Sequence, residues 1–77
     1  MEFERLQQII SDKLNITLDK ITLESRFEED LSADSLDLLN VVMEVEEEFG
    51  ISIADEQLMG ISTVEDALEA INKVINE

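Results

Sequence analysis

The sequence predicts a single all-α domain over residues 1–77: a small bundle of three main helices plus one short helix, with a long ordered loop between the first and second helices. Three observations predict this class. Apolar residues recur at helical spacings of three and four in three separate segments, and the chain contains no Pro to interrupt them. The only alternating apolar run is Ile51-Ser52-Ile53, which is too short to form a sheet without a partner strand. A chain of 77 residues holds one small core and no second domain.

The first helix is predicted from about Glu2 to Leu14. Acidic residues in its first turn and Lys13 in its last turn suit the helix dipole. From Asn15 to Asp34 the helical period is lost, although Asp19 to Ile21 allow a single turn. Apolar residues still recur along this stretch, so we expect an ordered loop that is pinned to the core. The apolar residues of the loop are Ile16, Leu18, Ile21, Leu23, Phe27 and Leu31.

The second helix is predicted over Leu36 to Phe49. Asp34 and Ser35 are both N-cap types, and Gly50 suits the residue that follows a helix end. At about 100° per residue, two apolar sectors lie roughly 135° apart. The core sector holds Leu38, Val41, Val42, Val45 and Phe49, and the second holds Leu36, Leu39 and Met43 beside Asp37, Asn40, Glu44, Glu46 and Glu47. Either the helix is buried nearly all round, or the second sector is an exposed apolar strip rimmed by carboxylates.

The remaining chain predicts a short helix and a third main helix. The short helix covers about Asp55 to Met59 and is closed by Gly60, after a loop in which Ile51 and Ile53 turn inward. The last helix begins with a capping box, formed either by Ser62 with Glu65 or by Thr63 with Asp66. Its apolar stripe is Val64, Leu68, Ile71 and Ile75, flanked by the small residues Ala67 and Ala70.

The composition excludes most catalytic and metal chemistry. The chain has no Cys and no His, so disulfides, thiolate metal sites and a Ser–His nucleophile are ruled out. Gly50 and Gly60 are its only glycines, and they do not form a phosphate-binding loop. A calcium loop starting at Asp30 would place Ser35 where Gly is needed and Val41 where the bidentate Glu belongs. We therefore predict no catalytic residue, no metal site and no enzyme activity.

The charge predicts the kind of partner. The net charge is −15, and 14 acidic residues but no basic one lie between Arg26 and Lys73. Nucleic acid is excluded because binding its phosphates requires Lys and Arg, whereas basic proteins suit such a surface. No apolar run approaches the roughly 20 residues of a membrane span, and the acidic start is unlike a signal peptide. We expect a cytoplasmic monomer that does not insert into membranes.

The Ser35 side chain could have either of two roles. It could cap the helix only, or it could carry a phosphate group, because a helix N-terminus offers N–H donors and a favourable field to an anion. The neighbouring residues decide. Glu28 to Asp37, which includes the triplet Asp34-Ser35-Leu36, resembles the attachment signature of acyl carrier proteins. The resemblance runs from about Phe3 to Val74 and includes Leu38, Glu47, Phe49, Asp55-Glu56 and Thr63-Val64.

The resemblance implies a function. A phosphopantetheinyl transferase would esterify Ser35 with 4'-phosphopantetheine from coenzyme A, with Asp34 and Leu36 beside the attachment point. The thiol of this cofactor would carry acyl chains as thioesters for enzymes of fatty acid biosynthesis. Carriers for polyketide, peptide or alanyl transfer share the signature. An alternative from another class is an acidic adaptor without a prosthetic group.

Two further groups of residues follow from the second helix and from the resemblance. Partners with basic surfaces are expected to dock on Leu36, Asp37, Leu39, Met43, Glu44, Glu46 and Glu47. The resemblance implies an acyl-chain pocket between the second and last helices, for which the candidates are Val45, Ile53, Ile61 and Ala67. Three residues depart from the family pattern: Ser32 where Gly is frequent, Ala54 where Pro is frequent, and Asn40 where an acidic residue is common.

Overall fold

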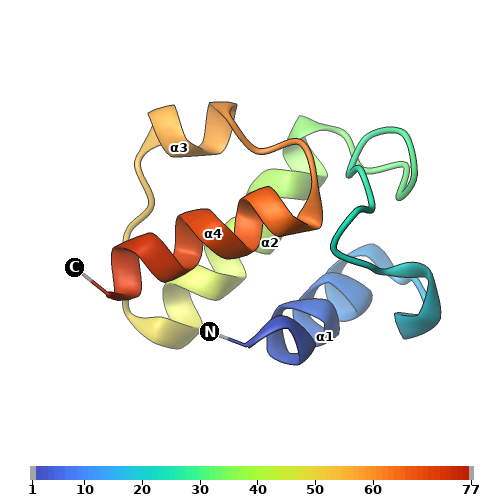
Figure 1. Cartoon of the computed structure of the whole chain (residues 1–77), viewed down its shortest axis with the longest axis horizontal. Coiled ribbons are helices and arrows are strands. Elements are labelled where there is room, and N and C mark those ends of the chain that lie inside the picture. Colours follow the sequence, from blue (N-terminus) through green and yellow to red (C-terminus); the bar gives the residue numbers. More distant parts are fainter. Residues whose placement is uncertain (1, 77) are drawn as a thin grey trace.

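The computed structural model describes residues 2–76, and all of its regular elements are helical (Figure 1). They are α1 (Phe3–Leu14), the 3₁₀ turn η1 (Leu18–Lys20), α2 (Ser35–Phe49), α3 (Asp55–Met59) and α4 (Val64–Ile75). The predicted all-α class, with three main helices, one short helix and a long first loop, is confirmed. Three elements differ from the prediction by one residue. Glu2 precedes α1 as its N-cap, and α2 begins at Ser35 and not at Leu36. The turn in the loop begins at Leu18 because Lys20 N–H bonds back to Thr17 O at 3.1 Å.

The core contains side chains from α1, α2 and α4 and from the loops between the helices. Its fully buried members are Leu6, Ile10, Ile21, Val41, Val45, Val64 and Ile71. Three apolar residues that were predicted to face the core are exposed: Leu18, Phe49 and Ile75. Phe49 and Ile75 are the last residues of α2 and α4. Leu18 is exposed because it lies in η1, which has no buried residue.

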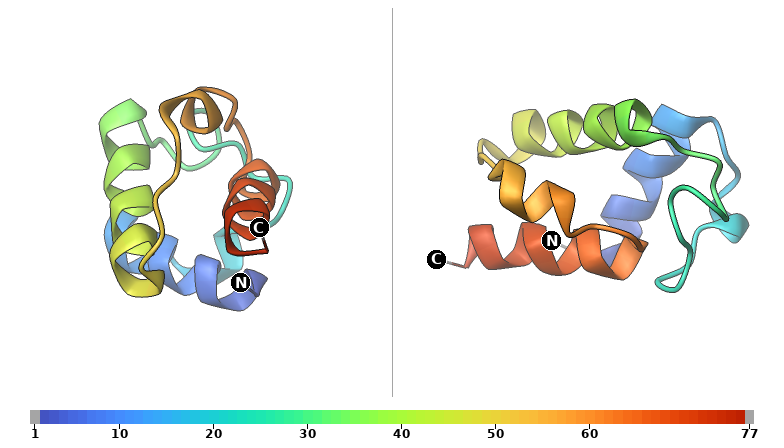
Figure 2. Two further views of the ribbon diagram at one scale, coloured as in Figure 1. Left: turned by 90° about the vertical axis from the view of Figure 1, so that its left-hand side faces the viewer. Right: turned by 90° about the horizontal axis from the view of Figure 1, so that it is seen from above.

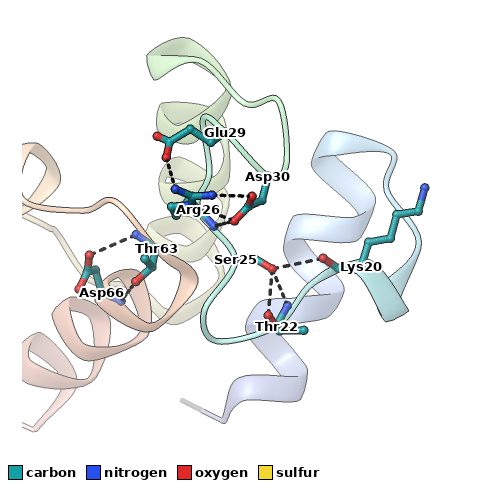
Figure 3. A network of polar contacts seen from close by, with 8 residues as sticks. All are labelled: Lys20, Thr22, Ser25, Arg26, Glu29, Asp30, Thr63 and Asp66. Carbon is teal, nitrogen blue, oxygen red and sulfur yellow. Dashed lines mark hydrogen bonds and ion pairs between the residues drawn. The ribbon is translucent and has the colours of Figure 1, made fainter.

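The loop between α1 and α2 is ordered by hydrogen bonds at its beginning. Gln7 Nε2 on α1 donates to Leu18 O at 2.8 Å and to Ile21 O at 2.9 Å. The buried Ser25 hydroxyl accepts from Thr22 N–H at 2.9 Å and donates to Lys20 O at 3.2 Å (Figure 3). These bonds give side-chain partners to N–H and C=O groups of the loop. A loop that lies against the core needs such partners, because its buried backbone groups cannot all bond to water.

Residues 23–27 of the same loop are joined to the start of α4. Phe27 N–H donates to Ser62 O, Val64 N–H to Ser25 O and Glu65 N–H to Leu23 O, each at 3.0 Å. We call these three bonds the loop–α4 junction. It brings together residues that lie about 40 positions apart in the sequence. The same two segments form one isolated β-bridge, between Arg26 and Thr63, which is the closest approach to a sheet among residues 2–76.

The junction coincides with the N-cap of α4. Thr63 is the cap: Asp66 N–H donates to Thr63 Oγ1 at 3.1 Å, so the second of the two predicted capping boxes is correct. Asp66 Oδ2 accepts from the N–H groups of Ser62 and Thr63, at 3.0 and 3.1 Å. These two backbone bonds hold the pKa of Asp66 below its ordinary value.

The last part of the loop makes a tight turn into α2. The Arg26 guanidinium contacts Glu29 at 2.8 Å and Asp30 at 3.2 Å (Figure 3), and its hydrogen bond lowers the pKa of Asp30. Ser32 adopts a left-handed conformation with φ of 55°. The buried Ala33 then donates its N–H to Phe27 O at 2.7 Å. This turn fixes where α2 begins.

Substitution of Ser32 by Gly should stabilise the fold. A residue with a Cβ pays about 1–2 kcal/mol in the left-handed region, and Gly loses about 0.5–1 kcal/mol more chain entropy on folding. We therefore expect Ser32→Gly to raise the free energy of unfolding by about 0.5–1 kcal/mol in urea denaturation. The control is Ser52→Gly, in an exposed loop with no positive φ, which should destabilise. Equal losses in both variants would contradict the prediction.

The lowered pKa of Asp66 predicts a pH dependence. A carboxylate whose pKa is lower in the folded chain stabilises it fully above the unfolded value of about 3.9, and the stabilisation is lost as pH falls through the folded value. The difference in unfolding free energy between the parent and Asp66→Asn should therefore be largest near neutral pH and shrink below about pH 4. Ser62→Ala, which removes no charge, should shift stability equally at all pH values. A constant parent-to-Asp66→Asn difference down to about pH 2 would contradict the assignment.

Candidate functional site

Ser35 is the first residue of α2, and Asp34 is the N-cap. Asp37 N–H donates to Asp34 Oδ1 at 2.9 Å, and Asp34 N–H donates to Asp37 Oδ2 at 3.4 Å. Of the two cap types in the sequence, only Asp34 performs this role, so helix capping does not require the Ser35 hydroxyl. Ser35 is exposed, and the N–H groups of Ser35 and Leu36 have no partner within the helix, whereas the N–H group of Asp37 is used by the cap. The site therefore offers an accessible hydroxyl beside N–H donors that suit a phosphate.

A groove of about 360 Å³ opens beside Ser35. It is lined by Ser35, Leu36, Leu38 and Leu39 of α2 and by Leu58 and Met59 of α3. Met59 is 87% exposed, and the sequence analysis did not assign a role to it or to Leu58. The five residues of α3 are too few for periodicity to show which side faces the site. The signal in the sequence was a large apolar residue, Met59, directly before Gly60.

The second apolar sector of α2 lies at the surface. Leu36 is 64% exposed, Met43 is 54% exposed and Leu39 is 40% exposed, so the helix is not buried all round. We call these three residues the apolar strip. Leu36 and Leu39 also form one wall of the groove, which makes the strip continuous with the surroundings of Ser35.

The carboxylates predicted to frame the strip have different environments. Asp37 belongs to the capping box, and Glu44 Oε1 lies 3.0 Å from Lys13 Nζ on α1. Arg5 of α1 pairs in the same way with Glu48, so the side of α2 that faces α1 is partly neutralised. The half-buried Glu46 binds Ile53 N–H through Oε2. Glu47 is exposed on α2 and has no such contact among residues 2–76.

The four residues expected to line an acyl pocket are all buried. Val45, Ile53, Ile61 and Ala67 belong to one core cluster. Ile61 also lines a second cavity of about 260 Å³ that reaches Ser35 between the loop, α2 and α3. Val45, Ile53 and Ala67 line neither this cavity nor the groove. A chain that started at Ser35 would meet Ile61 first and would have to separate core side chains to reach the other three.

Among residues 2–76, no group of three or more His, Cys, Asp or Glu side chains is placed to hold a metal ion. No helix in this range is both long enough and apolar enough to cross a membrane.

Comparison with known proteins places these features in a family. A family model described as the phosphopantetheine attachment site matches residues 4–71, which include Ser35 and both walls of the groove. The crystal structure of an acyl carrier protein from Thermotoga maritima superposes with a TM-score of 0.83 at 32% identity. The match covers 95% of this chain and 85% of that one. The chain belongs to the phosphopantetheine-bearing acyl carrier proteins, whose cofactor is phosphopantetheine and which are carriers and not enzymes.

Proposed function

We propose that Ser35 is the residue to which phosphopantetheine is attached. The proposal rests on the different roles of two neighbouring residues at the start of α2. Asp34 caps the helix, and the hydroxyl of Ser35 is left exposed at the edge of the groove. The phosphodiester would lie against the N–H groups of the first turn, beside Asp34 and Leu36. The chain has no His, so activation of the hydroxyl is assigned to a separate transferase.

The proposed cargo is a fatty acyl chain, carried as a thioester on the thiol that the cofactor supplies. Apart from Ser35, the groove is lined by aliphatic and Met side chains, which favour an apolar cargo over a polar one. This composition supports a role in fatty acid biosynthesis over the related carriers for peptide or alanyl transfer. A polyketide carrier remains the closest alternative, because its cargo is also partly apolar.

The longer part of the cargo is proposed to lie between α2 and α4. Ile61 borders the cavity that starts at Ser35, and Val45, Ile53 and Ala67 lie deeper in the same core cluster. Ala67 is the smallest of the four, so its surroundings can be separated at the lowest cost in lost contacts. Burial there would protect the thioester from water until a partner enzyme is reached.

Partner enzymes are proposed to dock on the apolar strip through basic surfaces. Leu36, Leu39 and Met43 would provide the apolar anchor. Asp37, Glu44, Glu46 and Glu47 would attract Lys and Arg on the partner. Since Glu44 and Glu46 already have contacts within the chain, Glu47 is the carboxylate best placed to meet a new cation.

Replacement of Ser35 by Ala should abolish loading by a phosphopantetheinyl transferase with coenzyme A, measured by intact mass. The free energy of unfolding should change by no more than about 0.5 kcal/mol, because the cap is Asp34 and Ser35 is exposed. Asp34→Ala should instead cost about 1 kcal/mol of stability through the lost cap. Ser62→Ala, which alters another exposed hydroxyl, should load like the parent. Loading of Ser35→Ala at a different residue would refute the assignment.

Substitutions in the strip and at its rim should affect different rate constants. Met43→Ala should speed dissociation from a transferase or synthase on the order of tenfold, because it removes an apolar anchor. Glu47→Lys should slow association and flatten its dependence on salt. Stopped-flow binding at several salt concentrations measures both. Leu18→Ala, an exposed apolar residue in η1, is the control and should bind like the parent. If Met43→Ala also binds like the parent, the strip is not the docking surface.

A further inference from the structure

Glu46 receives most of the backbone hydrogen bonds at the end of α2. Its carbonyl oxygen accepts from the N–H groups of Gly50 and Ile51, the latter at 3.1 Å. Its carboxylate Oε2 accepts from Ile53 N–H at 2.7 Å. Three of the four N–H groups in residues 50–53 are thus satisfied by one residue. The bond to Ile53 is the strongest in kind, because a charged acceptor shortens and strengthens a hydrogen bond.

This bond holds the chain directly before α3. The Ile53 side chain is buried in the core, so its N–H group has little access to water and needs a partner within the protein. The next residue, Ala54, is the N-cap of α3 but has no side-chain oxygen with which to cap the helix. Gln57 Oε1 accepts from Ala54 N–H at 3.2 Å, which is the only side-chain hydrogen bond to Ala54 among residues 2–76. The start of α3 therefore depends on how Ile53 is held.

The helix that follows cannot hold its own position. It has five residues, none of them buried, and a helix of this length is not stable in isolation. In the right-hand view of Figure 2, α3 is drawn between α2 and α4, and it is joined to α2 by the loop that Glu46 organises. Leu58 and Met59 of α3 form the wall of the groove opposite Leu36 and Leu39. Whatever fixes α3 thus fixes the width of the groove at Ser35.

We propose that Glu46 is a positioning residue, whose carboxylate holds Ile53 and thereby sets the position of α3 and of the groove wall beside Ser35. The sequence had suggested Glu46 only as one of the carboxylates that face partner enzymes. The structure gives it a second and internal role, about three helical turns from the attachment site. The effect on the cargo rests on the proposed function, whereas the effect on α3 does not.

The direct test is amide hydrogen exchange in the chain without its cofactor, measured by NMR for Glu46→Ala, Glu46→Gln and Glu46→Asp. Gln keeps an acceptor of the same reach without the charge, and Asp keeps the charge on a side chain too short to reach Ile53. Exchange at Ile53, Gln57 and Leu58 should be about tenfold faster in the Ala and Asp variants. It should stay within about twofold of the parent in the Gln variant and in the control Glu69→Ala, an exposed carboxylate on α4.

Three outcomes would overturn the proposal. The first is that the amide exchange rates of α3 are unchanged in Glu46→Ala. The second is that Glu46→Gln exchanges as fast as Glu46→Ala while Glu46→Asp exchanges like the parent, which would indicate an effect of charge. The third is an equal loss of protection in α1 and α4, which would indicate general destabilisation. Should Glu46→Ala not fold, the comparison of Gln with Asp still decides.

A second measurement links the position of α3 to function. Each variant is loaded with an acyl thioester, and the hydrolysis rate is compared with that of the free acyl-pantetheine thioester. Faster hydrolysis in Glu46→Ala than in Glu46→Gln is expected, and equal rates would refute the functional part of the proposal. If the parent itself hydrolyses as fast as the free thioester, then sheltering in the proposed function is wrong, and the exchange data alone decide the role of Glu46.

Discussion

The loop–α4 junction is the constraint on which the rest of the structure depends. Its three backbone bonds join residues 23–27 to residues 62–65, and one end of the loop is already held on α1 by Gln7. The same bonds place Ser62 and Thr63 where Asp66 can accept from both N–H groups, so they fix the start of α4. From Phe27 onward only the turn through Ser32 and Ala33 remains before α2. Residues 62–65, which lie far from Ser35 in the sequence, therefore help to determine the position of Ser35.

The distribution of charge gives the two sides of α2 different properties. The two basic residues of α1, Arg5 and Lys13, contact Glu48 and Glu44 across the α1–α2 interface. Such exposed pairs add little stability, but they neutralise the side of α2 that faces α1. The adjoining surface of α2 combines the apolar strip with Glu47, which is exposed and has no ion pair among residues 2–76. This polarity explains how a protein with a net charge of −15 can still present a defined surface to basic partners.

The helices could be predicted from the sequence, because spacing within a segment reports local structure. Features that depend on distant residues could not. The two candidate capping boxes of α4 differ by one position. Glu65 N–H donates to Leu23 O and Val64 N–H donates to Ser25 O, so Glu65 N–H is not left for a cap at Ser62. Periodicity places Phe49 on the core side of α2 but does not show that the core ends before it. Ser35 could be proposed as the attachment serine from its neighbours in the sequence. Leu58, Met59 and the contact of Glu46 with Ile53 could not be predicted, because they depend on the position of α3.

We propose that this chain carries its cargo through Ser35, at the start of a helix that Asp34 caps. The most direct measurement is the mass of the protein isolated from its native cell, followed by fragmentation of the peptide that contains Ser35. We predict a mass increment of one phosphopantetheine, with or without an acyl group, located on Ser35. A fully unmodified population, or the same increment on another serine such as Ser32 or Ser62, would contradict the claim.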